Sequence, residues 1–251
     1  MDKQYLIRDD HIGMFKDFMP NELIDDYLNY FNKCEEQGAV YPRREDEMLV
    51  SDNAIDTIRD TNVPMTYNNK PFIDMFFKEK GIDSHTPLIA IHPGTSKDTS
   101  YKRWNISYYA AVADKLIERL GAKIIWTWGP GELDCAEAVV EKMKNESIIA
   151  CKTERLRQLA EIFRRCDLFL GSDSGPMHIA SFVKTPVAVI YGATDPVVNA
   201  PYEKNPHVVL RKDLPCNPCR KRNCQSRECM DMVKPDEVFD AVCKLLKLEV
   251  V

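Results

Sequence analysis

The chain has 251 residues, of which 44% are hydrophobic and 29% charged, enough to bury the core of one large domain. Its 34 basic and 39 acidic residues give a net charge of −5, which disfavours a dedicated nucleic-acid-binding protein, because such proteins usually carry a basic surplus. The sequence has no apolar run of the roughly 20 residues that a membrane helix needs, and its opening residues lack the apolar centre of a signal peptide. We therefore expect a cytoplasmic protein without a transmembrane segment and without a nucleic-acid partner.

The first 84 residues show no regular alternation of strands and helices. Residues 21–34 have apolar side chains at helical spacing, residues 35–70 are polar and interrupted by prolines, and residues 71–80 fit another helix. We interpret residues 1–84 as linker and packing helices, separate from a domain over residues 85–251.

From residue 88 onward, short apolar runs alternate with helical patterns. The predicted strands are 88–91, 123–126, 147–150, 167–170 and 186–191. The predicted helices are 107–120, 135–143, 156–163, 176–182 and one that begins after Pro235. This alternation predicts an α/β domain with a Rossmann-like parallel sheet covered by helices on both faces. Ligands of such sheets bind beyond the carboxyl ends of the strands, so the loops there are the candidates for function.

The first of these loops is HPGTSKDTSYKRW, which follows the strand at 88–91. Gly94 lets the backbone approach a ligand closely, Thr95 and Ser96 offer hydroxyls, and Lys102 and Arg103 add positive charge. These features suit a diphosphate, although the spacing is not that of a Walker loop. A solvated polar loop with a basic end is an equally good interpretation of the residues alone.

The second loop is WGPGE, after the strand at 123–126. Glu132 follows a glycine turn at a strand end, where a carboxylate can accept both hydroxyls of a ribose. An acidic residue stabilised by the dipole at a helix N-terminus has the same pattern, and the residues alone favour that simpler interpretation.

The third loop, GSDSGPMHIA, follows the strand at 167–170. A helix that begins near Ser174 exposes free N–H groups, which form an anion site, and His178 lies about one turn inside it. Asp173 and Ser174 also fit an ordinary helix cap, and His178 also fits a buried histidine with satisfied hydrogen bonds. Gly175 lies between these polar residues.

Nine cysteines are present, and four of them form the pattern C-x2-C-x4-C-x4-C at Cys216, Cys219, Cys224 and Cys229. Without an export signal, we interpret them as thiols or metal ligands rather than disulfides. Four cysteines in so short a segment fit a tetrahedral structural zinc site. Reduced thiols that pack a tight loop are the simpler interpretation, and an iron–sulfur cluster fits less well than zinc.

The four strand-end motifs HPG…KRW, GPGE, GSDSGPMHIA and YGATDP, taken in this order, carry a family signature. Over roughly residues 85–248 the chain resembles the C-terminal domain of glycosyltransferase family 9, the ADP-heptose:lipopolysaccharide heptosyltransferases. The resemblance implies the GT-B architecture, in which two Rossmann-like domains face a cleft and the C-terminal domain binds the nucleotide-sugar donor. It also implies inverting transfer of heptose without a required metal cofactor.

The resemblance further implies roles for individual residues. Thr95, Ser96 and Lys102 would contact the diphosphate, and Glu132 the ribose. The segment 152–156 would lie near the adenine. Asp173, Ser174, Gly175 and His178 would hold the sugar and the diphosphate. The expected partners are ADP-heptose or a related nucleotide sugar and a lipopolysaccharide-type glycolipid acceptor, with peripheral contact at the cytoplasmic face of the inner membrane.

The chain departs from the family pattern at its start. In the family, the N-terminal domain carries the acceptor site and, after a glycine-rich turn, the general base. Residues 1–30 of this chain contain no match to that turn. We expect residues 1–84 to be a remnant of that domain and the linker, and the chain to bind donor but transfer sugar poorly. One alternative is a non-catalytic nucleotide-sugar-binding module that acts with a partner chain. The other is a zinc-stabilised interaction protein with 220–222 as its contact surface, which leaves the ordered strand-end loops unexplained.

Overall fold

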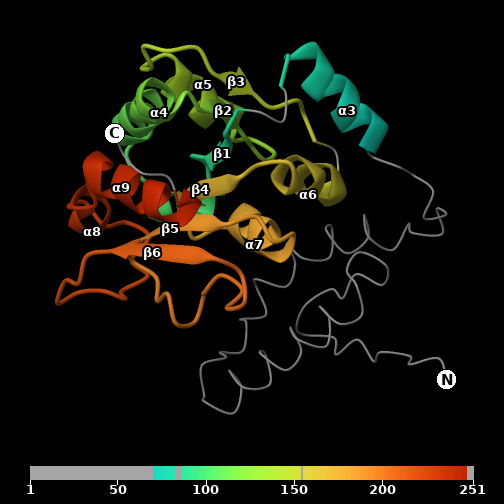
Figure 1. Cartoon of the computed structure of the whole chain (residues 1–251). Coiled ribbons are helices and arrows are strands. Elements are labelled where there is room, and N and C mark those ends of the chain that lie inside the picture. Colours follow the sequence, from blue (N-terminus) through green and yellow to red (C-terminus); the bar gives the residue numbers. More distant parts are fainter. Residues whose placement is uncertain (1–69, 83–85, 154, 248–251) are drawn as a thin grey trace, which may run out of the picture. The chain divides into compact units, whose positions relative to one another are not determined.

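The computed structural model describes residues 70–82, 86–153 and 155–247, which form a parallel sheet between two helical layers (Figure 1). The sheet has six strands in the order β3-β2-β1-β4-β5-β6, and every neighbouring pair is parallel. The strands are β1 (Leu88–His92), β2 (Lys123–Trp126), β3 (Ile148–Ile149), β4 (Leu168–Ser172), β5 (Val187–Tyr191) and β6 (His207–Arg211). The predicted α/β fold class with a parallel sheet is confirmed.

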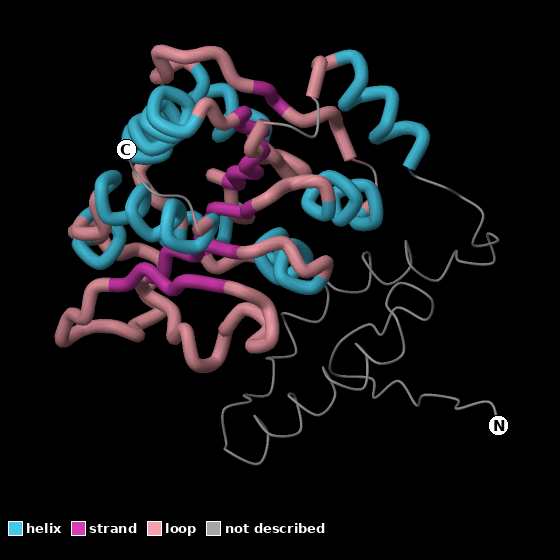
Figure 2. The backbone as a smooth tube through the Cα atoms, in the orientation of Figure 1, coloured by secondary structure: helices cyan, strands magenta, loops and turns pink. Residues whose placement is uncertain are grey.

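Helices precede, connect and follow the strands (Figure 2). They are α3 (Lys70–Glu79), the 3-10 helix η1 (Lys97–Lys102), α4 (Ile106–Leu120), α5 (Leu133–Val140), α6 (Leu156–Arg164), α7 (Gly175–Phe182), α8 (Glu228–Asp231) and α9 (Pro235–Leu246). Strand β6, η1 and α8 are additions to the predicted elements, and α5 begins and ends a few residues before the predicted helix. The helix predicted at 21–34 lies outside the described residues.

Alternating strand residues feed two core layers on opposite faces of the sheet. In β1, Ile89 and Ile91 pack into the layer of α4, α5 and α9, whereas Leu88 and Ala90 pack into the layer of α3, α6 and α7. All five residues of β1 are buried, as are those of β4 and β5. Strands buried on both faces have continuous apolar runs, which is why these strands could be located in the sequence.

Helix α4 shows how local sequence sets the bounds of an element. The side chain of Asn105 accepts a hydrogen bond from the Ser107 N–H at 2.9 Å and so caps the first turn. Gly121 ends the helix in the left-handed conformation with φ of 61°, which glycine adopts without a steric penalty. The predicted stop at Gly121 is therefore confirmed.

Helix α3 packs on the sheet as part of the compact unit Asn69–Val251. Phe76 and Phe77 are buried in the same layer as α6, and Arg165 lies over the Phe77 ring at 5.0 Å. The Arg165 guanidinium also forms an ion pair of 2.5 Å with Asp74. The helix predicted at 71–80 is thus present and contributes to the core, and the proposed boundary at residue 84 stays a prediction.

None of the helices in the described part of the chain is both long enough and apolar enough to cross a bilayer. The longest, α4, has 15 residues and buries one face against the sheet.

The buried face of α4 gives a direct test of the core. Leu116 is 0% exposed, whereas Leu156 at the start of α6 is 51% exposed. We expect Leu116→Ala to lower the free energy of unfolding by about 2–5 kcal/mol, because the lost methylene groups leave a cavity. The matched variant Leu156→Ala should cost less than about 1 kcal/mol. Urea unfolding measures both, and equal effects would contradict the assignment of the core.

Candidate functional site

The predicted site residues follow three neighbouring strands at the same edge of the sheet. Strand β1 pairs with β2 on one side and β4 on the other, with Ile91 opposite both Trp126 and Leu170. The loops after these strands, together with η1 and the first turn of α7, contain all eight predicted donor-binding residues. The sheet therefore brings together segments that lie up to about 80 residues apart in the sequence, at the edge where parallel sheets bind ligands.

An ion pair joins the first and third loops. The Lys102 ammonium, at the end of η1, donates a hydrogen bond of 2.9 Å to Asp173 Oδ2 at the end of β4. Their side chains are 18% and 4% exposed, so the pair is largely removed from water. Ser172, just before Asp173, is buried and lies 3.2 Å from the Tyr109 hydroxyl, which anchors this strand end.

The N-terminus of α7 opens next to this ion pair. Ser174 is the N-cap residue, but its side chain makes no capping hydrogen bond, and its buried Oγ has no hydrogen-bond partner in the described structure. A Cβ at Gly175 would meet nothing within 4 Å. The simple helix-cap interpretation is therefore wrong for Ser174, because its hydroxyl points to no backbone N–H of the helix.

His178 lies one turn into α7, beside the same charges. Burial lowers the pKa of His178, Asp173 acts in the opposite direction, and Lys102 lowers the pKa further. The net effect is a lowered pKa, so the imidazole is neutral near physiological pH. A neutral ring can donate one hydrogen bond and accept another, which suits contacts to sugar hydroxyls.

Glu132 turns back toward the strand ends instead of capping α5. It is the N-cap residue of that helix but makes no side-chain capping bond. Its Oε2 accepts a hydrogen bond of 2.9 Å from the Gly129 N–H and lies 3.1 Å from His92 Nε2. A Cβ at Gly94 would approach Glu132 to 2.9 Å, so the glycine predicted to admit a ligand makes room for this side chain. The helix-dipole interpretation of Glu132 is incomplete, because the carboxylate reaches a second strand end.

The hydroxyls of the first loop are engaged within the loop. Thr95 is buried and donates a hydrogen bond of 3.0 Å to the Thr99 carbonyl, and Ser96 Oγ lies 2.8 Å from Thr99 Oγ1. The Arg103 guanidinium donates to the Thr95 carbonyl and, at 3.3 Å, to its hydroxyl. These contacts shape the loop, and direct contact of Thr95 and Ser96 with a diphosphate stays a prediction.

The segment from 227 to 233 supports the first loop from behind. The Arg227 guanidinium donates a hydrogen bond to the Arg103 carbonyl, and the Trp104 indole N–H donates to the Val233 carbonyl at 3.0 Å. Trp104 is 2% exposed, so this second contact is buried. The cysteine-containing part of the chain thus helps to position Lys102 and Arg103.

Of the four cysteines of the proposed zinc site, only Cys229 is buried. Cys229 is buried against Gly192, where a Cβ would lie 2.9 Å from its sulfur, and Cys216 is exposed. Burial raises the pKa of the Cys229 thiol, with smaller contributions from the other three thiols. Among the described residues, no three or more His, Cys, Asp or Glu side chains are gathered so that they could hold a metal ion. Structural zinc therefore stays a prediction.

Metal analysis of the purified protein decides the question of zinc. The spacing predicts about one zinc ion per chain, lost in the Cys229→Ser variant. A zinc content below about a tenth of one ion per chain would instead favour the arrangement of free thiols.

The remaining predicted contact, between 152–156 and an adenine, lies after β3. Trp128 donates a hydrogen bond of 2.9 Å from its indole N–H to the Ala150 carbonyl and so ties the second loop to the end of β3. Residue 154 is outside the described residues, and the role of this segment stays a prediction.

Three structural roles at the site were not predicted. They are those of His92 and Thr127 and the hydrogen bonds from Arg103 to Thr95. His92 is 1% exposed at the end of β1, and its Nδ1 lies 3.1 Å from Thr127 Oγ1 at the end of β2. The one signal in the sequence was a histidine directly after a buried strand. Its neighbours Thr127, directly after β2, and Glu132, directly before α5, could not be identified without the sheet order.

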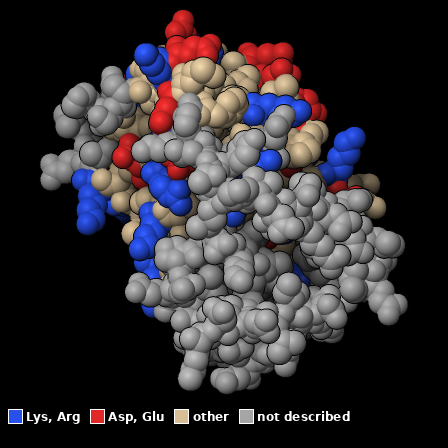
Figure 3. Space-filling view, turned by 90° about the vertical axis from the view of Figure 1, so that its right-hand side faces the viewer, with Lys and Arg blue, Asp and Glu red and all other residues tan. Residues whose placement is uncertain are grey.

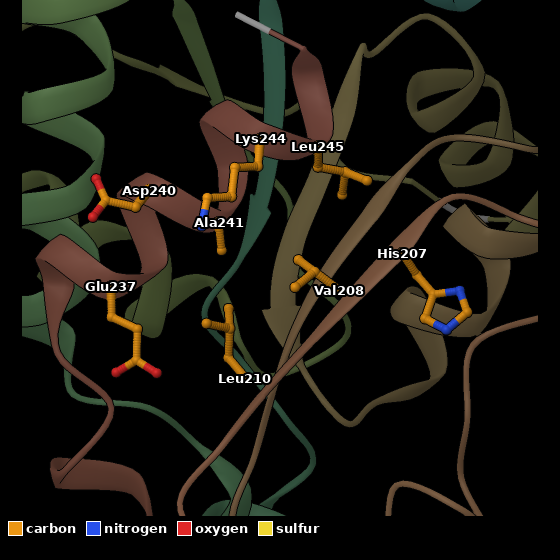
Figure 4. A pocket seen from close by; sticks show the side chains of 8 residues that line it. All are labelled: His207, Val208, Leu210, Glu237, Asp240, Ala241, Lys244 and Leu245. Atoms are coloured by element: carbon orange, nitrogen blue, oxygen red, sulfur yellow. The ribbon is translucent and has the colours of Figure 1, made fainter. Parts of the chain in front are cut away.

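A separate groove runs along the outer edge of the sheet, between β6 and α9 (Figure 4). It encloses about 660 Å³, and Val208, Leu210 and Ala241 form its apolar floor while Glu237 and Asp240 stand at its side. None of the predicted donor-binding residues lines it.

On the face shown in Figure 3, acidic side chains gather along the upper edge and basic ones are scattered among the other described residues.

The ion pair between the loops predicts a specific pattern of stability. Lys102→Met leaves the Asp173 carboxylate buried without its partner, so we expect a loss of about 3 kcal/mol in the free energy of unfolding. Adding Asp173→Asn should recover part of this loss, because the neutral amide needs no cation. Urea unfolding of both single variants and the double variant gives the coupling energy.

Lys115→Met is the matched control for Lys102→Met. Lys115 pairs with Asp236 at 2.7 Å, but the Asp236 side chain is 83% exposed, so this variant should cost less than about 1 kcal/mol. Strictly additive effects of the two site substitutions would show that the Lys102–Asp173 pair does not couple the loops.

Comparison with known proteins places this geometry in a family. Residues 46–230 match the model of glycosyltransferase family 9 (heptosyltransferase). The chain is 28% identical over 165 residues to lipooligosaccharide heptosyltransferase 2 of Campylobacter jejuni, covering 64% of this chain and 51% of that protein. It is 31% identical over 150 residues to lipopolysaccharide heptosyltransferase 3 of Escherichia coli, covering 58% and 43%. The chain spans about half the length of the curated relatives it matches.

Solved structures agree with the sequence matches. A family 9 glycosyltransferase from Veillonella parvula superposes with a TM-score of 0.62 at 28% identity, over 69% of this chain and 50% of that one. E. coli ADP-heptose lipopolysaccharide heptosyltransferase II shares the fold, with a TM-score of 0.59 at 20% identity over the same shares. The family match covers more than half of the sequence and contains all four strand-end motifs. This chain therefore belongs to glycosyltransferase family 9, the heptosyltransferase family.

Proposed function

We propose that this chain binds a nucleotide-sugar donor at the carboxyl ends of β1, β2 and β4 and presents its sugar for inverting transfer. The donor is ADP-heptose or a related nucleotide sugar, and the acceptor is a lipopolysaccharide-type glycan. The observation that carries the proposal is the ion pair Lys102–Asp173 beside the open N-terminus of α7, where Ser174 Oγ is buried without a partner.

The diphosphate of the donor fits the N-terminus of α7. Helix N-termini present free N–H groups and a partial positive charge to anions. The space beside Gly175 admits a phosphate close to the backbone, and Ser174 Oγ supplies a further donor. Lys102 adds a full positive charge, which a phosphate would share with Asp173.

The ribose and the sugar fit the remaining groups. Glu132 offers a carboxylate at the end of the second loop, and the segment 152–156 lies after the neighbouring strand for an adenine. The neutral ring of His178 and the carboxylate of Asp173 are available to sugar hydroxyls. Support for heptose comes from the curated relatives, which are named heptosyltransferases, and ADP is the nucleotide that the sequence resemblance implies.

In the proposed reaction, the acceptor hydroxyl oxygen forms a bond to the anomeric carbon of the sugar. The bond between that carbon and the diphosphate oxygen breaks, and ADP leaves with the electron pair. A base that we do not assign among the described residues takes the acceptor proton. Lys102 and the N-terminus of α7 stabilise the charge of the leaving diphosphate, so these residues can act without a metal cofactor.

The chain acts either as an enzyme by itself or as a nucleotide-sugar-binding module with a partner chain. A transfer assay with the purified 251-residue chain separates the two. Loss of a general base usually costs about 10²–10⁴-fold in rate, so slow transfer together with tight donor binding would identify the binding module. We place either form at the cytoplasmic face of the inner membrane, where the proposed acceptor would be met.

Calorimetric titration tests the donor site. We expect ADP-heptose and ADP to bind more tightly than UDP and GDP sugars. Lys102→Ala should weaken ADP binding by about 10-fold to 100-fold, because it removes a charged hydrogen-bond donor from the diphosphate. Asp173→Ala should weaken ADP-heptose more than ADP, because Asp173 is proposed to contact the sugar as well.

Lys115→Ala is the control for this titration, since Lys115 lies on α4 and pairs with Asp236 away from the strand-end loops. Its nucleotide affinity should equal that of the unmodified protein. The proposal is overturned if no adenine nucleotide binds, or if Lys102→Ala and Lys115→Ala have the same affinity.

A further inference from the structure

His92 occupies a position between the three strand ends that form the proposed donor site. It is the last residue of β1, is 1% exposed, and lies opposite Gly171 of β4 in the sheet register. Its two ring nitrogens face Thr127, after β2, and Glu132, after the glycine turn. A buried histidine with a hydroxyl on one side and a carboxylate on the other is in the arrangement of an oriented donor.

The partners determine which ring nitrogen carries a hydrogen. Nε2 lies 3.1 Å from Glu132 Oε2, and an ionised carboxylate only accepts hydrogen bonds, so Nε2 must be protonated. In the neutral ring this leaves Nδ1 as the acceptor, 3.1 Å from the Thr127 hydroxyl. That hydroxyl lies 3.4 Å from its alternative acceptor, the Ile91 carbonyl, so the contact to the ring is the shorter one.

The Glu132 carboxylate is held through one of its two oxygens. The Gly129 N–H and His92 Nε2 both approach Oε2, and no described residue donates a hydrogen bond to Oε1. The His92 contact is bent away from an ideal hydrogen-bond line, which leaves the nitrogen without an aligned acceptor. Oε1 is therefore available to accept hydrogen bonds from a ligand.

The charge state of Glu132 agrees with this arrangement. Burial raises the pKa of Glu132, but the contact with His92, the Gly129 amide and the Arg103 charge together lower it below the ordinary value. The carboxylate is therefore ionised near neutral pH, and its unpaired oxygen can accept hydrogen bonds from a vicinal diol.

We propose that His92, oriented by Thr127, is a positioning residue that holds the Glu132 carboxylate in the orientation in which it accepts the two ribose hydroxyls of the nucleotide. This inference rests on the proposed function and deepens it. It makes the preference for a ribose over a deoxygenated sugar depend on the contacts of His92 with Thr127 and Glu132. His92 itself touches no ligand in this arrangement, because the ring is buried and its Nε2 faces Glu132.

The experiment compares two probes that differ only at the ribose. Binding of ADP and of 2′,3′-dideoxy-ADP is measured calorimetrically for the unmodified chain, Glu132→Ala, His92→Ala, His92→Gln and Thr127→Val. We expect the unmodified chain to prefer ADP by about tenfold or more, because its two ribose hydroxyls donate hydrogen bonds to a charged group. Glu132→Ala should abolish the preference.

His92→Ala should reduce the preference for ADP to about twofold or less while the affinity for dideoxy-ADP stays unchanged, because only the orientation of Glu132 is lost. His92→Gln should retain part of the preference, since its amide N–H can replace Nε2. Thr127→Val should weaken the preference, because Nδ1 then lacks its donor and the ring can adopt the tautomer with an unprotonated Nε2. His92→Gln and Thr127→Val keep the test available if His92→Ala does not fold.

The outcomes separate this inference from the proposed function. If the unmodified chain binds neither nucleotide, the donor site itself is wrong. If Glu132→Ala loses the ribose preference but the His92 and Thr127 variants keep it, the donor site stands and the positioning role of His92 is overturned. Equal weakening of both nucleotides in the His92 variants would show that His92 only supports the fold at the end of β1.

Discussion

Parallel pairing of β1 with both β2 and β4 is the constraint on which the rest of the site depends. Parallel strands end at the same edge of the sheet, so three loops that are distant in sequence must meet there. The helices that connect the strands lie on the two faces of the sheet. A site built at this edge rests on buried strands, and its side chains therefore start from fixed positions.

Two polar contacts then join the loops in pairs. Lys102 and Asp173 connect the loops after β1 and β4, and His92 and Glu132 connect the end of β1 with the loop after β2. Burying a single charge would cost several kcal/mol, so each carboxylate needs the partner that the neighbouring strand supplies. Because these groups are already oriented, a nucleotide sugar would meet them without a large reorganisation of the protein.

The packing behind the first loop has a different character. The segment with Cys229, the last of the four clustered cysteines, contacts this loop twice. Arg227 donates a hydrogen bond to the Arg103 carbonyl, and the Val233 carbonyl accepts one from the Trp104 indole. Gly192 at the end of β5 admits Cys229 and Met230 against the sheet, where a larger residue would collide with their sulfur atoms. The cysteine segment is therefore connected to the donor loop by direct contacts, whether or not its thiols bind a metal.

The sequence predicted the parts of the fold that local patterns encode. Strands buried on both faces and helices with one apolar face were located within a few residues, and the stop at Gly121 followed from its chemistry. Strand β6 was missed because it lies at the edge of the sheet, where Val209 is 38% exposed and the apolar run is short. The family signature in the four loops also came from local sequence, because each motif lies within one loop.

Sequence by itself thus determined the fold class, the family and the set of polar residues near the strand ends. Only the tertiary structure decided which of those residues pair: that Lys102 meets Asp173, that Glu132 turns to His92 instead of capping α5, and that Ser174 is left without a partner. The physical reason is that periodicity and turn chemistry act over a few residues. The contacts of the site, in contrast, depend on strand order and register, which join residues far apart in the chain.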